Sequence, residues 1–254
     1  MSWILLRGLA REARHWGAFT GRFARQCGNE DVVPLDLPGN GEFYLQTSPV
    51  HVREVVEFLR LQLRVKALPP PYNLLAVSLG GMVAADWAQR YPHEVTRLVL
   101  VNTSMRPFSS APQRLRPTNW LQLALAAARW RDADYAERVV HQLTCNDAAA
   151  RNIDLAAWLQ IRKSAPVAAA NVARQLLAAA RFSCAPAAPA CGVLVLSSSA
   201  DHLVDPLCSD QLAAAWQVAH HQHTWAGHDL PHDDTAWVCQ KVADWLTGSL
   251  NRQN

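Results

Sequence analysis

Leu74-Leu75-Ala76-Val77-Ser78-Leu79-Gly80-Gly81-Met82 is the stretch of sequence that says most about this chain. The apolar run Tyr72–Val77 has no polar alternation, which predicts a strand buried on both faces of a parallel sheet. Residues 82–90 predict a helix that ends before Tyr91-Pro92, because proline does not continue a helix. A small-x-Ser-x-Gly turn therefore joins a buried strand directly to a helix.

This strand–turn–helix context is that of a nucleophile elbow, in which a tight turn projects the serine hydroxyl. Residues two before and two after Ser78 must be small to avoid the opposing backbone. Gly80 meets this demand, and Ala76 stands where glycine is usual. The helix start turns unpaired N–H groups toward the site, so the N–H of Leu79 is a candidate oxyanion donor. The alternative is that Ser78 is only a turn serine ahead of a helix.

Apolar runs alternate with helical patterns along much of the chain, which predicts an α/β fold of about six mostly parallel strands flanked by helices. Helices are predicted at residues 50–65 and 234–246, where apolar residues recur at helical spacing. The candidate strands are residues 3–6, 32–35, 72–77, 98–101, 193–197 and 223–225.

Residues 106–182 contain no strand signal and are rich in alanine and leucine. Helices are predicted at 121–130, 133–143 and 167–180. We expect this segment to form a helical lid over the strand ends, inserted into a core made of residues 1–105 and 183–254. The alternative is a helical decoration that touches no site.

An activated serine needs a base, and the base needs an orienting partner. Asp201 follows the strand at 193–197, and His228 follows Gly227 after the last candidate strand. They are the predicted acid and base. Asp205 is the competing acid, but it precedes Pro206 and is typical of a turn before a helix.

The region around His228 is rich in histidine, so a metal cluster is the alternative function for these side chains. His228 and His232 have a spacing used by zinc sites on helices, yet Pro231 between them breaks a helix. We therefore predict no metal site.

The loop after the first strand begins with Arg7, Gly8 and Leu9. Arg7 and Trp16 are predicted to contact the substrate. With Arg11 and Arg14, Arg7 forms a cationic loop that favours a negatively charged substrate. The alternative is that these arginines are solvated or pair with Glu12 and other acids.

Composition narrows the function further. The chain has 254 residues, half of them hydrophobic, and a net charge of +3 without a long Lys/Arg block, so neither nucleic acid nor a membrane surface is an expected partner. Six scattered cysteines without a C-x-x-C pair favour buried free thiols in a reducing compartment. With no signal peptide and no apolar stretch near the length of a membrane span, we expect a cytoplasmic protein.

Taken together, these features resemble the α/β-hydrolase superfamily, in the style of its small bacterial serine carboxylesterases. The matching pieces, in family order, are Arg7-Gly8 with Trp16, Asp36-Leu37-Pro38-Gly39-Asn40-Gly41, Ala76 to Gly81, Asp201 with Val204, and Gly227-His228. The chain departs from the family at Arg7 and Asn40, where histidine is usual, and at Ala76.

The resemblance implies a Ser-His-Asp triad of Ser78, His228 and Asp201, with backbone N–H groups of Leu9 and Leu79 as the oxyanion hole. It implies hydrolysis of a small ester or thioester through an acyl-enzyme without a cofactor. It also implies that the first two strands of the family's usual sheet are missing. A lyase or C–C hydrolase on the same fold, and a non-catalytic ligand-binding protein, remain alternatives. The sequence leaves the oligomeric state open.

Overall fold

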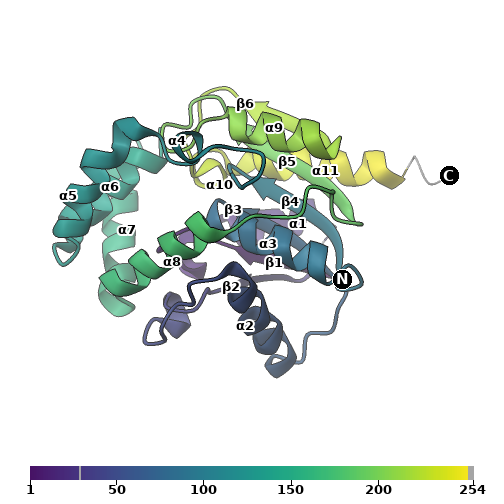
Figure 1. Cartoon of the computed structure of the whole chain (residues 1–254), viewed down its shortest axis with the longest axis horizontal. Helices are drawn as coiled ribbons and strands as arrows, with labels where there is room; N and C mark the ends of the chain where they lie inside the picture. Colours follow the sequence, from purple (N-terminus) through teal and green to yellow (C-terminus); the bar gives the residue numbers. More distant parts are fainter. Residues whose placement is uncertain (29, 251–254) are drawn as a thin grey trace.

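The apolar runs pair side by side into one parallel sheet with the strand order β2-β1-β3-β4-β5-β6 (Figure 1). The structure is a computed structural model that describes residues 1–28 and 30–250. The strands are β1 (Ser2–Leu6), β2 (Val32–Leu35), β3 (Tyr72–Val77), β4 (Val95–Val101), β5 (Gly192–Ser198) and β6 (Ala219–His223). The sheet of six strands predicted from the sequence is thereby confirmed.

The last strand differs from its predicted position. It spans Ala219–His223 instead of residues 223–225. β6 lies at one edge of the sheet and pairs with β5, through Leu194↔Ala219 to Ser198↔His223. Most of its side chains are exposed, so backbone pairing sets its place and no apolar pattern marks it in the sequence.

Strand β1 shows how the sheet is buried on both faces. Ile4 and Leu6 belong to one hydrophobic cluster, and Trp3 and Leu5 belong to another. All four side chains are fully buried. Because successive side chains of a strand point to opposite faces, an unbroken apolar run is what a strand covered on both sides requires.

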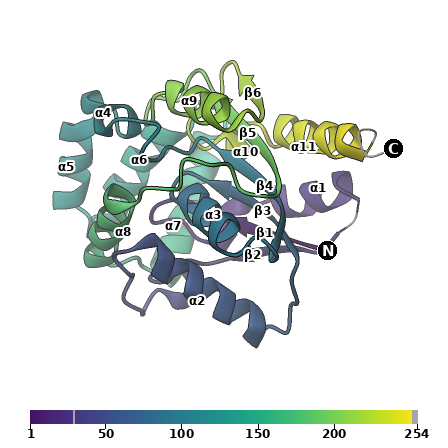
Figure 2. The same cartoon turned by 45° about the vertical axis from the view of Figure 1, so that its right-hand side comes forward.

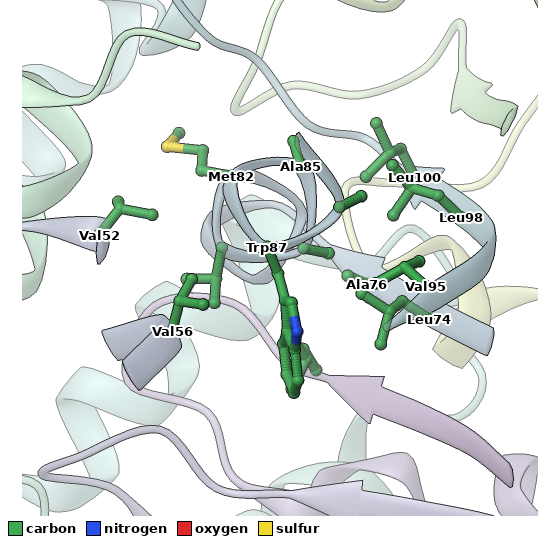
Figure 3. Packing of buried hydrophobic residues seen from close by; sticks show 14 of the residues in the cluster. Val52, Val56, Leu74, Ala76, Met82, Ala85, Trp87, Val95, Leu98 and Leu100 are labelled. Carbon is green, nitrogen blue, oxygen red and sulfur yellow. The ribbon is translucent and has the colours of Figure 1, made fainter. Parts of the chain in front are cut away.

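Helices α2 (Val52–Val65), α3 (Leu79–Arg90) and α9 (Leu207–Trp216) cover the face to which Ile4 and Leu6 point. Figure 3 shows Trp87 and Met82 of α3 among side chains of α2 and of the strands. The indole of Trp87 is fully buried, and its Nε1–H donates to Glu94 over 2.9 Å. The predicted helix at residues 82–90 therefore forms, and it begins three residues earlier, directly after Ser78.

The opposite face is covered by α1 (Phe19–Gln26) and α11 (Thr235–Leu250). Phe23 of α1 meets Trp3 of the sheet edge-on, with ring centroids 5.0 Å apart. The described structure also contains a four-residue helix, α10 (Leu230–Asp233), and the 3-10 turns η1 (Ala13–Trp16), η2 (Gly41–Phe43) and η3 (Pro117–Asn119). Five of the six free cysteines are buried, as the sequence predicts, and Cys191 is half-buried.

The segment between β4 and β5 is helical, as predicted. It contains α4 (Ala111–Arg114), α5 (Trp120–Ala128), α6 (Ala133–Thr144), α7 (Arg151–Ser164) and α8 (Ala169–Arg181). Helices α5 to α7 stand together on the side of the sheet away from both termini (Figures 1 and 2). Helix α7 was not predicted, because its apolar residues are spread around the helix and only Trp158 is buried. Within residues 1–28 and 30–250, no helix is long and apolar enough to cross a membrane.

Candidate active site

The predicted site residues follow the carboxyl ends of four strands. Arg7 comes after β1, Ser78 after β3, Asp201 after β5 and His228 after β6. Since all strands run parallel, these ends meet at one edge of the sheet, which is where α/β proteins bind their ligands. Ser78, Arg7 and His228 line a single cavity there.

Ser78 lies in a strained backbone conformation with φ 55° and ψ −118°. For a residue with a side chain, such a conformation costs about 1–3 kcal/mol, so contacts with the surrounding structure must stabilise it. Hydrogen bonds to the end of β4 and the residues after it contribute: the Ser78 N–H donates to Val101 O over 3.0 Å, and Thr103 Oγ1 donates to Ser78 O over 2.8 Å. The half-exposed side chain of Ser78 reaches the cavity from this turn.

The small residues around Ser78 are required by close packing of the backbone. A Cβ on Gly80 would lie 2.6 Å from Arg7 O, so the start of α3 touches the end of β1. A Cβ on Gly8 would lie 3.2 Å from Ser78 Cβ. Ala76 is fully buried between Leu6 and Leu100 of the neighbouring strands, where its methyl group is accommodated.

His228 is joined to Asp201 by a hydrogen bond of 2.7 Å between Nδ1 and Oδ2. The other carboxylate oxygen of Asp201 accepts the backbone N–H groups of Leu203 and Val204, over 2.8 and 2.9 Å. Both side chains are buried. Asp201 is thus held by its own loop and presents one oxygen to the ring of His228.

Burial alone would lower the pKa of His228. The charge and hydrogen bond of Asp201, with the charge of Asp229, outweigh burial and the opposing charge of Arg7, so the pKa is raised above its ordinary value. Asp201 therefore stabilises the protonated form of the His228 ring.

Asp205 has a separate structural role. Its Oδ1 accepts the Leu207 N–H over 3.0 Å at the start of α9, and its own N–H donates to Gln113 O. This is the turn position that the sequence indicated, and the geometry places Asp201 rather than Asp205 on His228.

Three other histidines of this region have partners of their own. His220 contacts Ser197, His223 contacts Asp234, and His232 contacts Asp154. In the part of the chain that the structure describes, no three His, Cys, Asp or Glu side chains are grouped to hold a metal ion.

Arg7 forms a buried ion pair with Asp229, the residue directly after His228. Arg7 Nη1 donates to Asp229 Oδ1 over 2.9 Å, and Nη2 donates to Oδ2. Both residues line the cavity, yet they are only 3% and 4% exposed. Burial by itself would raise the pKa of Asp229, but the Arg7 guanidinium lowers it to about 2. Sequence reasoning missed Asp229, although its place beside His228 was a signal.

The remaining residues of the predicted cationic loop are also paired within the chain. Arg11 Nη1 donates to Glu137 over 2.7 Å, and Arg14 Nε donates to Glu12 over 2.6 Å. Trp16 packs in the core beneath Arg7, whose Cζ lies 4.8 Å from the ring centroid. The structure therefore supports the alternative reading, in which these arginines pair with acids of the chain itself.

The cavity has a volume of about 210 Å³, and its wall is mainly apolar. Leu9 lines it, and Leu79 is the first residue of α3, whose N–H has no acceptor within the helix. More than half of the lining residues come from the helical insertion: Leu115, Leu123, Ala126, Ala127, Trp130, Val139, Val140, Leu143, Thr144, Val172 and Leu176.

Comparison with known proteins places the chain in a family. The sequence model described as "Alpha/beta hydrolase family" matches residues 3–241. The chain belongs to the alpha/beta hydrolase family. As a member, it has the family's parallel sheet and its helical insertion after β4.

Two curated relatives match this hydrolase over part of its length. A pimeloyl-[acyl-carrier protein] methyl ester esterase of Chromobacterium violaceum is 38% identical over 95 residues, 36% of this chain and 35% of that protein. The biotin biosynthesis bifunctional protein BioHC of Teredinibacter turnerae is 29% identical over 102 residues, 40% of this chain and 17% of that protein. The matches thus span about a third or less of each relative's own length.

Among solved structures, a thermophilic esterase from Thermogutta terrifontis aligns with a TM-score of 0.77 and 23% identity, covering 98% of this hydrolase and 90% of that chain. At this identity the likeness shows the fold alone.

Proposed function

We propose that this hydrolase cleaves a carboxylic ester or thioester through an acyl-enzyme formed on Ser78. The observation that carries the proposal is the convergence of a strained serine and an Asp201-bonded histidine on one apolar cavity. A serine hydroxyl is a weak nucleophile, and this pairing of base and acid is what activates it.

In the proposed reaction, His228 Nε2 takes the proton of the Ser78 hydroxyl while Oγ attacks the carbonyl carbon. The N–H groups of Leu9 and Leu79 stabilise the tetrahedral oxyanion. The protonated ring then gives its proton to the leaving alcohol or thiol. Water, deprotonated by the same ring, releases the acid and frees Ser78.

The proposed substrate carries an uncharged, apolar acyl group. The cavity wall is mainly apolar, and Arg7 and Arg11, the two arginines on it, already hold carboxylates of the chain. The similarity to a pimeloyl-[acyl-carrier protein] methyl ester esterase supports ester chemistry. We assign residues 106–182 the role of a lid, because they build more than half of the cavity wall.

The test is covalent labelling of Ser78 by an organophosphonate, combined with ester hydrolysis by Ser78→Ala. Loss of a nucleophile costs about 10⁴–10⁶ in rate, so Ser78→Ala should fall to background while Ser183→Ala, an exposed control, keeps full activity. His228→Ala should slow labelling sharply. An adduct mapped to another serine, or a Ser78→Ala enzyme with more than about a tenth of the wild-type rate, contradicts the proposal.

A further inference from the structure

Trp130 lies between two hollows of the molecule. It lines the cavity that contains Ser78 and His228. It also lines the second hollow, a groove of about 600 Å³ whose wall includes Lys163, Pro166 and Val167. The groove is lined only by residues of the helical insertion, and Trp130 is the residue that both hollows share.

The indole of Trp130 is held in place from several sides. Its Nε1–H donates to Val167 O over 2.8 Å, and the guanidinium carbon of Arg162 lies 4.0 Å from the ring centroid. Arg162 Nη2 also donates to the backbone oxygen of Trp130 over 2.6 Å. Arg162 is itself anchored to Glu137 over 3.0 Å. A side chain with these restraints forms a fixed wall.

We propose that Trp130 sets the length of acyl chain that the cavity accepts, by closing it toward the groove. This proposal rests on the function proposed above. Ser78 lies at the sheet edge, and Trp130 lies on the insertion side of the same cavity. A chain attached at Ser78 and extended along the apolar wall ends against the indole. With the indole removed, the chain continues into the groove along Val167 and the alanines that follow it.

Hydrolysis assays with esters of different acyl chain length test this role of Trp130 directly. Each methylene that finds an apolar contact strengthens binding by about fourfold, and a methylene that meets a wall adds nothing or is rejected. In the wild type, kcat/KM for p-nitrophenyl esters should rise from butanoate to a medium length and then fall. In Trp130→Ala, the ratio of dodecanoate to hexanoate should increase by about tenfold or more.

Two variants sharpen the test. Trp120→Ala removes a tryptophan that is exposed at the start of α5 and does not line the cavity, and should leave the ratio unchanged. Ala127→Phe adds bulk to the cavity wall and should shift the preference toward shorter esters. If Trp130→Ala does not fold, Trp130→Leu keeps an apolar side chain there and should show a smaller shift in the same direction.

A binding measurement separates this inference from the proposed function. In a Ser78→Ala background, calorimetry with n-alkan-1-ols of increasing length should show an affinity that levels off with Trp130 and continues to rise with Trp130→Ala. If the wild type hydrolyses no ester but the plateau moves, the proposed function is wrong and the role of Trp130 stands. If the ester ratio and the alkanol plateau are both unchanged by Trp130→Ala and Trp130→Leu, the role of Trp130 is wrong.

Discussion

The buried pair of Arg7 and Asp229 offers the sharpest test of how this site is held together. Replacing Asp229 by Asn leaves the Arg7 guanidinium 3% exposed and without its carboxylate. Removing one partner of a buried ion pair lowers the free energy of unfolding by about 3–5 kcal/mol. For a domain of this size each kcal/mol lowers the melting temperature by roughly 2–4 °C, so Asp229→Asn should melt roughly 6–20 °C below the wild type.

The assay is thermal unfolding followed by circular dichroism at neutral pH. The double variant Arg7→Met with Asp229→Leu removes both charges and should recover much of the loss, because no unpaired charge is then buried. Asp134→Asn breaks the exposed pair with Arg138 and serves as the matched control, expected to change little. A loss of less than a few degrees in Asp229→Asn, or a double variant no more stable than the single one, would refute this account.

The same pair makes stability depend on pH. Asp229 has a folded-state pKa of about 2, below the ordinary 3.8 of an aspartate. The lowered pKa therefore adds roughly 2 kcal/mol to the free energy of unfolding above about pH 4, and this contribution is lost as the pH falls toward 2. Acid titration of the unfolding free energy should show this loss in the wild type. The double variant should lack it, and an identical acid slope in both would contradict the assignment.

Three further predictions concern the reacting groups. Asp201→Asn should lower kcat by roughly 10³–10⁴ in ester hydrolysis assays, whereas Asp205→Asn should have little effect; the reverse order would assign the acid to Asp205. The raised pKa of His228 predicts that kcat/KM falls as the pH drops through a value above 6.5, and a pH profile with its acid limb below 6.5 would contradict this. Gly80→Ala should reduce both the melting temperature and kcat, because the new Cβ would lie 2.6 Å from Arg7 O; a fully active, equally stable variant would show that the elbow is not tightly packed.

Elements marked by a local run of apolar residues were predicted from the sequence. The runs Val32–Leu35 and Tyr72–Val77 were predicted with the bounds that the structure has. The turn at Ser78 was predicted because an apolar strand, a serine flanked by small residues and a helix follow one another directly. This order is specific to a nucleophile elbow. Each of these signals lies within a few residues.

Other features depended on pairing between distant segments. The edge strand β6 is polar and is defined by its hydrogen bonds to β5. The partner of Arg7 is 222 residues away, so the sequence showed a cationic loop while the fold shows an internal ion pair. Asp201 and Asp205 both follow β5, and only the path of the loop placed Asp201 against His228.

The sequence by itself determined the parallel α/β core, the turn at Ser78 and the order of serine, aspartate and histidine along the chain. The tertiary structure decided which charges neutralise one another, where the polar edge strand pairs, and that Trp130 stands between the cavity and the groove. The physical reason is that periodicity reports whether a segment is buried. It carries no information about which distant side chain a buried charge or a cavity wall will meet.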